Sequence, residues 1–564
     1  MLGKLKSLMM LRRDASMKTR TRARAGLMSL VFACAFIIVG GRLVNLGVSG
    51  LGEHNSVKGM QLSTAVRRPD IVDRNGRMLA TDIQTGSLFA NPSQVVDPDT
   101  TVEQLATVLT DVEMRPLRKR LTGGGKFTWI ARELTPRQQA QVHELGLPGL
   151  DFVSEPHRAY PAGTTTSHIL GYVDVDNHGL AGAETYVEKI SVSKDSTKKR
   201  PRSLKPVRLS MDLGVQHVVR EELASAIERY KAKAATGIVL DVHTGEVVSL
   251  VSLPDYDPHK REQAMERDRF NRVSSGVYEL GSVFKVFTTA AALDAGVTTI
   301  DKGYDARQPL KVASFTINDF HAKKRWLSVP EIFIYSSNIG SAKMALDLGT
   351  KRHQAFLRKV GLLDRVDTEF GPSAAPIIPA NWSKLNTMTI AFGHGLSVTP
   401  LHFASSAAAL LNGGYKVKPT FLAKSRDEVE GDQKRVVKLQ TSDLMRYLLR
   451  LNVQQGSGKR ADVAGYRVGG KTGTAEKVVN GKYSRSKLMN SFFAAFPMDA
   501  PEYLVLVTID EPQGVEETGG KATAGLNAAP TAGRIIERIG PMLNVTPVFN
   551  RGERVFDEQV KASY

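Results

Sequence analysis

The chain has 564 residues, of which 42% are hydrophobic and 24% are charged, and its formal net charge is +19. This length exceeds what one hydrophobic core serves, so we expect roughly two to four globular domains. Cys34 is the only cysteine, which excludes an internal disulfide and any cysteine-based metal site. Aromatic residues do not interleave the basic clusters, so we do not expect nucleic acid as a partner. The positive charge instead favours attraction to an anionic surface.

The N-terminus combines a basic tract with an apolar segment. Residues 1–25 carry eight lysine and arginine side chains against Asp14. Residues 26–48 form a mostly apolar run that would span roughly 34 Å as a helix, enough to cross a bilayer with Arg42 near its far end. A cleaved signal peptide and a lipid-modified Cys34 are disfavoured, because the apolar run continues well past Cys34. We predict one transmembrane helix, with residues 1–25 in the cytoplasm and the remainder exported.

Residues 49–205 have the mixed pattern of an irregular α/β module, here called the pedestal. Thr100 to Glu103 has the form of a capping box, and Thr135-Pro136 starts a helix that Gly146 ends. A basic polar tract at 194–208 marks a boundary or an exposed connector. Charged and turn-forming residues gather at three places in the pedestal, where we favour a structural role over catalysis: Arg68, Asp73, Arg74, Gly76, Arg158, Tyr160, Pro161, Gly163, Gly179, Gly182 and Glu184.

From about residue 206 the pattern is that of an α+β domain. The expected elements are a helix at 215–233, two strands within 236–254, a hairpin turn at Asn480-Gly481, strands at 490–496 and 502–510, and a helix at 531–539 closed by Gly540-Pro541. This order predicts an antiparallel sheet flanked by helices.

Ser282 to Gly296 is the segment around which the chemistry is expected. It is apolar and alanine-rich, and it ends in glycine, which is typical of a buried helix with a glycine C-cap. Ser282 and Lys285 are three residues apart and therefore share one helix face. Ser-x-x-Lys also occurs at Ser191, Ser196 and Ser484, where polar surroundings indicate a solvated loop. An apolar helix instead buries Lys285, which is costly for an ammonium without a function, so we interpret the pair as nucleophile and base.

Two further groups of residues can assist such a serine. Ser336-Ser337-Asn338 offers a hydroxyl to relay a proton and an amide, and Lys471 to Thr474 offers a cation and hydroxyls for a carboxylate. Residues 465–472 also match the phosphate-loop pattern G-x-x-x-x-G-K-[ST]. We reject that interpretation, because a phosphate loop opens a helix, whereas here a strand and hairpin are expected.

Taken in order, Ser282-Val-Phe-Lys285, Ser336-Ser-Asn338 and Lys471-Thr-Gly473 resemble the three active-site motifs of the penicillin-binding proteins and serine β-lactamases. The resemblance implies that Ser282 is the nucleophile and Lys285 its base, that Ser336 relays the proton, and that Asn338 orients Lys285 or the substrate amide. It also implies that Lys471, Thr472, Gly473 and Thr474 receive the substrate carboxylate, and that the backbone N–H groups of Ser282 and Thr474 form the oxyanion hole.

The pedestal residues and the N-terminal anchor resemble those of class B enzymes, so the resemblance covers nearly the whole chain. Pro69 and Leu280 depart from the usual glycine and proline of the family motifs. The resemblance implies five parts: a basic cytoplasmic tail at 1–25, a transmembrane helix at 26–48, a pedestal at 49–205, a transpeptidase domain at 206–545 and a C-terminal tail at 546–564.

By the same resemblance the chain is a peptidoglycan D,D-transpeptidase of the inner membrane, with stem peptides as substrates, β-lactams as inhibitors and neither cofactor nor metal. Asn338 and Thr472 favour the division-specific enzyme over the wall-elongation relative. The implied partners are a polytopic glycan-polymerising glycosyltransferase and bitopic division proteins. A D,D-carboxypeptidase, a β-lactamase, a non-catalytic division scaffold and an antibiotic sensor stay open as alternatives.

Overall fold

The computed structural model describes residues 26–45, 68–110, 112–194, 205–312, 315–430 and 433–549. The basic tail at 1–25 lies outside these residues, as do the connector at 195–204 and the C-terminal tail beyond 549. Two units, 1–64 and 65–564, make up the chain and are described separately.

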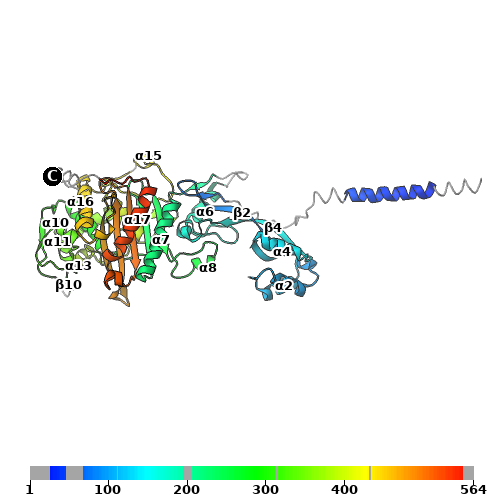
Figure 1. Ribbon diagram of the computed structural model, residues 1–564, viewed down its shortest axis with the longest axis horizontal. Helices are drawn as coiled ribbons and strands as arrows, with labels where there is room; N and C mark the ends of the chain where they lie inside the picture. Colours follow the sequence, from blue (N-terminus) through cyan, green and yellow to red (C-terminus); the bar gives the residue numbers. More distant parts are fainter. Residues whose placement is uncertain are drawn as a thin grey trace, which may run out of the picture. The chain divides into compact units, whose positions relative to one another are not determined.

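The described residues of the first unit form a helix, Gly26–Asn45, drawn in deep blue in Figure 1. Its mean hydropathy is 2.2, and none of its residues is buried. It is long and apolar enough to cross a membrane. The predicted helix is thus confirmed over 26–45, while positions 46–48 lie outside the described residues.

A five-stranded sheet forms the core of the pedestal. Strands β3 (Thr128–Leu134), β2 (Met78–Ala90), β1 (Ile71–Val72) and β5 (Val207–Arg208) follow one another, and β4 (Leu150–Ala159) also pairs with β2. The helices of this part are α2 (Pro98–Ala106), α3 (Met114–Thr122), α4 (Pro136–Glu144), α5 (Ser167–Leu170) and α6 (Gly182–Lys194).

Two helix starts were predicted in the pedestal, and one of them is wrong. Thr135 caps α4 through a capping box with Gln138, as expected. The capping box at Thr100 does not form, because α2 already begins at Pro98 and Asp97 is its N-cap, accepting from the N–H groups of Asp99 and Thr100.

An antiparallel five-stranded sheet organises the second half of the chain. Its order is β14 (Gly469–Val479), β15 (Lys482–Phe496), β16 (Tyr503–Asp510), β6 (Ala234–Asp241) and β7 (Val247–Leu253). Asn480 and Gly481 have positive φ and form the predicted turn between β14 and β15. Because β14 is the edge strand, one side of its backbone is not used by the sheet.

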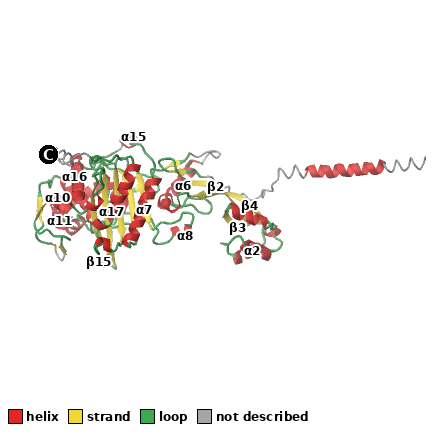
Figure 2. Ribbon diagram, viewed as in Figure 1, coloured by secondary structure: helices red, strands yellow, loops and turns green. Residues whose placement is uncertain are grey.

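Helices cover both faces of this sheet. On one face α7 (Leu213–Tyr230) and α17 (Ala528–Met542) pack on the strands, and Figure 2 shows them lying across the sheet. The other face carries α9 (Lys285–Asp294), α14 (Pro400–Ala408) and α16 (Leu439–Gln455). Beyond them lie α10 (Val329–Ile334), α11 (Asn338–Leu348), α12 (Thr350–Lys359) and α13 (Lys384–Ile390). The predicted helix-flanked antiparallel sheet is confirmed.

The remaining elements are short. Two of them are helices, α8 (Arg261–Ala264) and α15 (Asp427–Glu430). Three strand pairs follow: β8 (Gly303–Asp305) with β11 (Trp326–Ser328), β9 (Leu310–Val312) with β10 (Phe315–Ile317), and β12 (Asp367–Thr368) with β13 (Gly371–Pro372). The 3-10 turns are η1 (Pro92–Gln94), η2 (Gly163–Thr166), η3 (Gly281–Phe284), η4 (Lys459–Ala461), η5 (Glu516–Thr518) and η6 (Ala524–Leu526).

Two predicted helix boundaries are wrong. Ser282 lies in the 3-10 turn η3, and α9 begins only at Lys285, although Gly296 follows its end with a φ of +67° as expected. Helix α17 continues past the predicted stop at Gly540-Pro541, because a proline in the last turn removes only one helical hydrogen bond.

Candidate active site

Ser282 and Lys285 stand where η3 meets α9. Gly281, at the start of η3, has a φ of +63°, and a Cβ on it would lie 2.8 Å from the carbonyl oxygen of Thr474. This turn therefore needs glycine to pack against β14. Its geometry brings Lys285 Nζ to 2.8 Å from Ser282 Oγ. The lysine is only 1% exposed.

Four oxygen atoms surround Lys285 Nζ. Besides Ser282 Oγ they are the Ser336 carbonyl oxygen at 2.8 Å, Ser336 Oγ at 3.1 Å and Asn338 Oδ1 at 2.7 Å. The two carbonyl oxygens can only accept, so they use both hydrogens of a neutral amine. The nitrogen lone pair then faces the hydroxyl groups, which is the arrangement that a general base requires.

Ser336 occupies the link between α10 and α11. Its φ is +56°, the left-handed region that a residue with a side chain rarely adopts. Ser337 follows as the N-cap of α11, where its Oγ accepts from the N–H of Gly340 at 3.0 Å. This tight link directs the Ser336 hydroxyl and carbonyl and the Asn338 amide toward Lys285.

Lys471 reaches the same cluster from the edge strand β14. Its Nζ donates to Ser336 Oγ at 3.0 Å, so the Ser336 hydroxyl lies between two lysines. The side chain is completely buried, with Nζ 5.8 Å from the centre of the Phe333 ring. Because β14 begins at Gly469, Lys471 lies inside a strand and not at a helix start, which excludes the phosphate-loop interpretation.

Burial lowers the pKa of both lysines. Burial lowers the pKa of Lys285 well below its usual value, the neighbouring Lys471 cation lowers it further, and Asp319 acts in the opposite direction. Burial alone lowers the pKa of Lys471 to about 7. Since the two cations would repel each other, we infer that Lys285 loses its proton first and that Lys471 retains the positive charge.

The residues after Lys471 are held by contacts of their own. Thr472 Oγ1 lies 2.5 Å from Ser457 Oγ, and Thr474 Oγ1 accepts from the N–H of Ala524 at 3.1 Å. A Cβ on Gly473 would lie 2.3 Å from the Leu280 carbonyl oxygen. Gly473 therefore lets β14 pack closely against η3.

The pedestal residues form an ion-pair network. Arg158 pairs with Asp82 at 3.1 Å and with Glu184 at 2.7 Å, and its Nη2 donates to the Pro69 carbonyl. Arg68 pairs with Glu184 at 2.9 Å and with Glu188. Tyr160 is buried beside this network. Gly179 and Gly182 stand so close to backbone atoms that a Cβ would lie within 2.6 Å of them.

The other predicted pedestal residues shape turns and the contact with the following domain. Asp73 accepts from the N–H groups of Asn75 and Arg77, with Gly76 in the turn at a φ of +85°, and Arg74 pairs with Glu246 at 2.8 Å. Gly163 donates from its N–H to the Tyr160 carbonyl, which closes the turn through Pro161. These contacts are those of a structural role.

Sequence reasoning missed Asp319 and Ser457. Asp319 accepts hydrogen bonds from Ser337 and Ile339, and Ser457 contacts Thr472. Both lie in loops without a motif or a periodic pattern, so their only signal is the tertiary contact itself.

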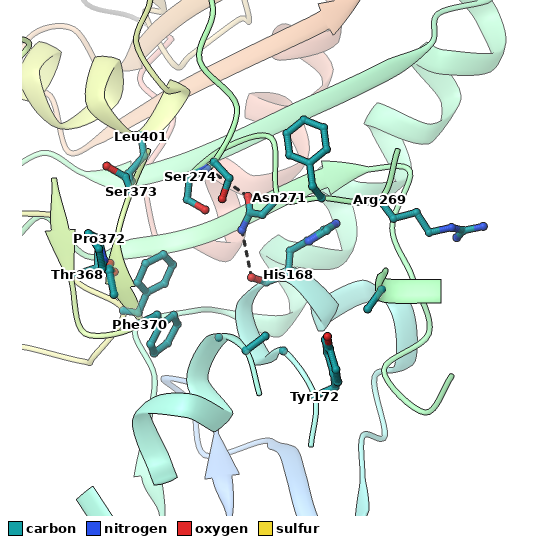
Figure 3. Close-up of a pocket in the computed structure, with 18 of the residues that line it drawn as sticks. His168, Tyr172, Arg269, Asn271, Ser274, Thr368, Phe370, Pro372, Ser373 and Leu401 are labelled. Atoms are coloured by element: carbon teal, nitrogen blue, oxygen red, sulfur yellow. Dashed lines mark hydrogen bonds between the residues drawn. The ribbon is translucent and has the colours of Figure 1, made fainter. Parts of the chain in front are cut away.

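A separate cavity of about 310 Å³ lies where the pedestal meets the following domain (Figure 3). His168 and Tyr172 line it from the pedestal, and Asn271, Ser274 and Phe370 line it from the other side. Asn271 Nδ2 donates to the His168 carbonyl at 3.3 Å. None of the candidate catalytic residues lines this cavity.

Comparison with known proteins agrees with this geometry. Residues 235–537 match the penicillin binding protein transpeptidase domain, and residues 63–195 match the penicillin-binding protein dimerisation domain. The probable peptidoglycan D,D-transpeptidase FtsI of Caulobacter vibrioides is 40% identical over 488 residues, which cover 85% of this chain and 82% of that protein. The peptidoglycan D,D-transpeptidase FtsI of Escherichia coli K12 is 27% identical over 526 residues, covering 88% and 87%.

A solved structure shows the same fold. The crystal structure of penicillin binding protein 3 from Mycobacterium tuberculosis, complexed with aztreonam, covers 86% of this chain and 98% of its own with a TM-score of 0.66. Its sequence identity of 23% limits this likeness to the fold.

Proposed function

The chain belongs to the class B penicillin-binding proteins, and from this premise we propose that it is a peptidoglycan D,D-transpeptidase that cross-links stem peptides during septal wall synthesis. The observation that carries the proposal is the buried Lys285 amine 2.8 Å from Ser282 Oγ, with Ser336, Asn338 and Lys471 around it. The names of the FtsI relatives support the division-specific role.

In the acylation step Lys285 removes the proton of Ser282 as Oγ attacks the penultimate D-Ala carbonyl of a donor stem. The C–N bond to the terminal D-Ala then breaks. The leaving amine takes its proton from Ser336, and Ser336 recovers a proton from the protonated Lys285 amine 3.1 Å away; Lys471 Nζ lies 3.0 Å from the same hydroxyl. An acceptor-stem amine then attacks the resulting ester and gives up a proton to Lys285. Lys285 returns that proton to Ser282 Oγ as the ester bond breaks and the cross-link forms. The two N–H groups proposed for the oxyanion hole, those of Ser282 and Thr474, would stabilise the negative charge in both steps.

Lys471 keeps its charge in this scheme and has two effects. It lowers the pKa of Lys285, and it attracts the terminal carboxylate of the stem or the equivalent carboxylate of a β-lactam. The hydroxyls of Thr472 and Thr474 lie on the same strand and would complete the carboxylate site, with Gly473 keeping that strand against η3.

The apolar helix Gly26–Asn45 supports a single-pass membrane anchor. We place residues 1–25 in the cytoplasm and the pedestal and transpeptidase domain on the periplasmic side, because the basic tract precedes the helix. A glycan-polymerising glycosyltransferase and bitopic division proteins are the proposed partners at the anchor and pedestal.

The test is covalent labelling followed by product analysis. Wild-type protein should acquire a long-lived adduct from a fluorescent penicillin, and Ser282→Ala should acquire none; an adduct on the alanine variant would remove Ser282 as nucleophile. Incubation with a donor pentapeptide and an acceptor stem should give the cross-linked dimer. Release of D-Ala without dimer would identify a carboxypeptidase, and fast turnover of penicillin would identify a β-lactamase. The absence of any reaction would indicate a scaffold or sensor.

A further inference from the structure

Asp319 lies outside the three motifs, yet it contacts the second of them at two points. It is half-buried in the loop after β10. Its Oδ2 accepts from Ser337 Oγ at 2.7 Å, and its Oδ1 accepts from the N–H of Ile339 at 2.9 Å. One carboxylate therefore holds the residues on both sides of Asn338.

Asn318, the residue before Asp319, fixes the orientation of the Asn338 side-chain amide. Asn338 Nδ2 donates to the carbonyl oxygen of Asn318 at 2.9 Å, which leaves Oδ1 to face Lys285 Nζ at 2.7 Å. The loop at Asn318 and Asp319 thus determines which end of the amide points toward the proposed base.

The contacts of Asp319 matter because the link between α10 and α11, which they hold, has an unfavourable backbone conformation. Ser336 has a φ of +56°, a conformation that is unfavourable for a residue with a side chain unless its surroundings impose it. On the N-terminal side, the N–H of Ser337 donates to the Ile332 carbonyl at 2.9 Å. On the C-terminal side the Asp319 carboxylate is the anchor.

Asp319 also contributes charge. The charged or titratable groups that act on Lys285 are Lys471 from β14, Asp319 from the loop after β10 and His394 from the loop after α13. Lys471 disfavours the ammonium form of Lys285, and Asp319 favours it. Burial keeps His394 neutral at pH 7, so Asp319 is the anionic group in this set.

We propose that Asp319 is a positioning residue of the acyl transfer, which holds Ser336 and Asn338 against Lys285 and supplies the negative charge that opposes Lys471. The proposal rests on the proposed function, in which Lys285 is the base. It assigns no contact between Asp319 and the substrate.

Three variants separate the charge from the hydrogen bonds. Asp319→Asn removes the charge but can still accept from Ile339 and donate to Ser337 Oγ. Asp319→Glu keeps the charge on a longer side chain. Ser337→Ala keeps the charge and removes two hydrogen bonds of Ser337 Oγ, the one to Asp319 and the N-cap bond from the N–H of Gly340. Asp305→Asn is the matched control, because the Asp305 side chain on β8 pairs with Arg307. Its contact with Lys343 of α11 is made by the backbone carbonyl, which the variant keeps.

The readout is the rate of labelling by fluorescent penicillin as a function of pH, with the full chain in detergent and its thermal unfolding measured in parallel. At acid pH the labelling rate falls, and we call this part of the pH–rate profile the acid limb. For Asp319→Asn we expect the acid limb to shift to lower pH by about half a unit to one unit, since the ammonium form of Lys285 loses its anionic neighbour. Ser337→Ala and Asp319→Glu should lower the maximal labelling rate, the plateau of the profile, by about threefold to tenfold and leave the pH of the acid limb unchanged. Asp305→Asn should match the wild type.

An acid limb of Asp319→Asn that coincides with that of the wild type would overturn the proposal, whether or not the plateau falls. A wild-type protein that acquires no Ser282-dependent adduct would instead overturn the proposed function, so the two failures are distinguishable. If Asp319→Asn unfolds below the assay temperature, Asp319→Glu and Ser337→Ala decide: a plateau unchanged in both would also refute the positioning role.

Discussion

At the scale of single residues, a lysine three positions from a serine becomes a base only if its amine is neutral. Lys285 is buried and lies close to a second lysine, and both conditions lower its pKa. The acylation rate should therefore fall as the pH decreases through this lowered pKa, because protonation removes the lone pair that accepts the Ser282 proton.

Replacement of Lys285 by alanine should reduce the rate of acylation by penicillin at least about 100-fold, which is the lower end of what a general base contributes. The rate is measured by quenched-flow labelling. Lys302→Ala is the control, because Lys302 is exposed and its ion pair is with Asp347. A Lys285→Ala rate within tenfold of the wild type would contradict the assignment of the base.

His353 gives a prediction about stability rather than catalysis. It is completely buried in α12, and neither of its ring nitrogens has a hydrogen-bond partner among the described residues. Burial lowers its pKa to about 4, whereas in the unfolded chain it stays near 6.5. Because the folded-state pKa is the lower one, the contribution to stability is complete above about pH 6.5 and is lost as the pH falls toward 4.

This loss amounts to about 3 kcal/mol at pH 4. His353→Phe should therefore lose less stability between neutral and acid pH than the wild type, as measured by urea unfolding at each pH. His217→Gln, at an exposed position on α7, should follow the wild type. Parallel curves for wild type and His353→Phe would show that His353 does not titrate in this range.

Residues related by local geometry were predictable, and residues related by tertiary contact were not. The three-residue spacing of Ser282 and Lys285 brings them together in any helical or 3-10 turn, so the sequence alone suggested the pair. Asp319 reaches Ser337, which lies 18 positions further along the chain, beyond β11 and α10. No periodicity or motif connects these two positions, so this contact could not be deduced.

At the scale of elements, the close contact between β14 and η3 determines the width of the site. Gly473 and Gly281 make it possible, because a Cβ on either would meet backbone atoms of the other element within 3 Å. The strand and the turn carry Lys471 and Ser282 respectively, so a small separation of the two elements moves the proposed cation away from the nucleophile.

Gly473→Ala should therefore reduce acylation by penicillin at least about tenfold, because the backbone of β14 must shift to relieve the overlap with the Leu280 carbonyl. Gly481→Asn is the control: it lies at the hairpin end of the same strand pair, has open space around it and a φ of +77°, which asparagine tolerates. Equal labelling rates for Gly473→Ala and wild type would show that the contact does not determine the geometry.

The prediction of helices and strands was most accurate where the composition of a segment was decisive. The strands around 236–254, 490–496 and 502–510 are buried along their length and were recognisable as apolar runs. The extent of α17 and the 3-10 start at Ser282 were missed, because both depend on how the segment ends pack and not on the pattern inside them.

At the scale of the whole molecule, the boundary proposed between residues 205 and 206 does not separate two independent sheets. Strand β5 (Val207–Arg208) pairs in parallel with β1 of the pedestal, and Leu209 then forms a bridge with Leu422 on the other side. Val207 and Leu209 are both buried. Both residues belong to one hydrophobic cluster, which also holds Ile71 of the pedestal and Leu250 of the second sheet.

Side chains reinforce this junction near the start of α7. Arg74 pairs with Glu246 at 2.8 Å, Asn75 Nδ2 donates to Asp212 Oδ2 at 2.7 Å, and Asp73 accepts from the N–H of Leu213 at 3.1 Å. Because these contacts are partly buried, their loss should weaken the coupling between the pedestal and the transpeptidase domain without altering the fold of either part.

The double variant Arg74→Ala/Asn75→Ala should lose about 1–3 kcal/mol of stability, and its calorimetric transition should broaden or split where the wild type shows one. The reacting residues lie elsewhere, so penicillin labelling should stay within about twofold of the wild type. Arg118→Ala, which breaks an exposed ion pair inside the pedestal, is the control and should leave the transition unchanged. A single transition of wild-type width in the double variant would show that the backbone pairing through 207–209 suffices to couple the two parts.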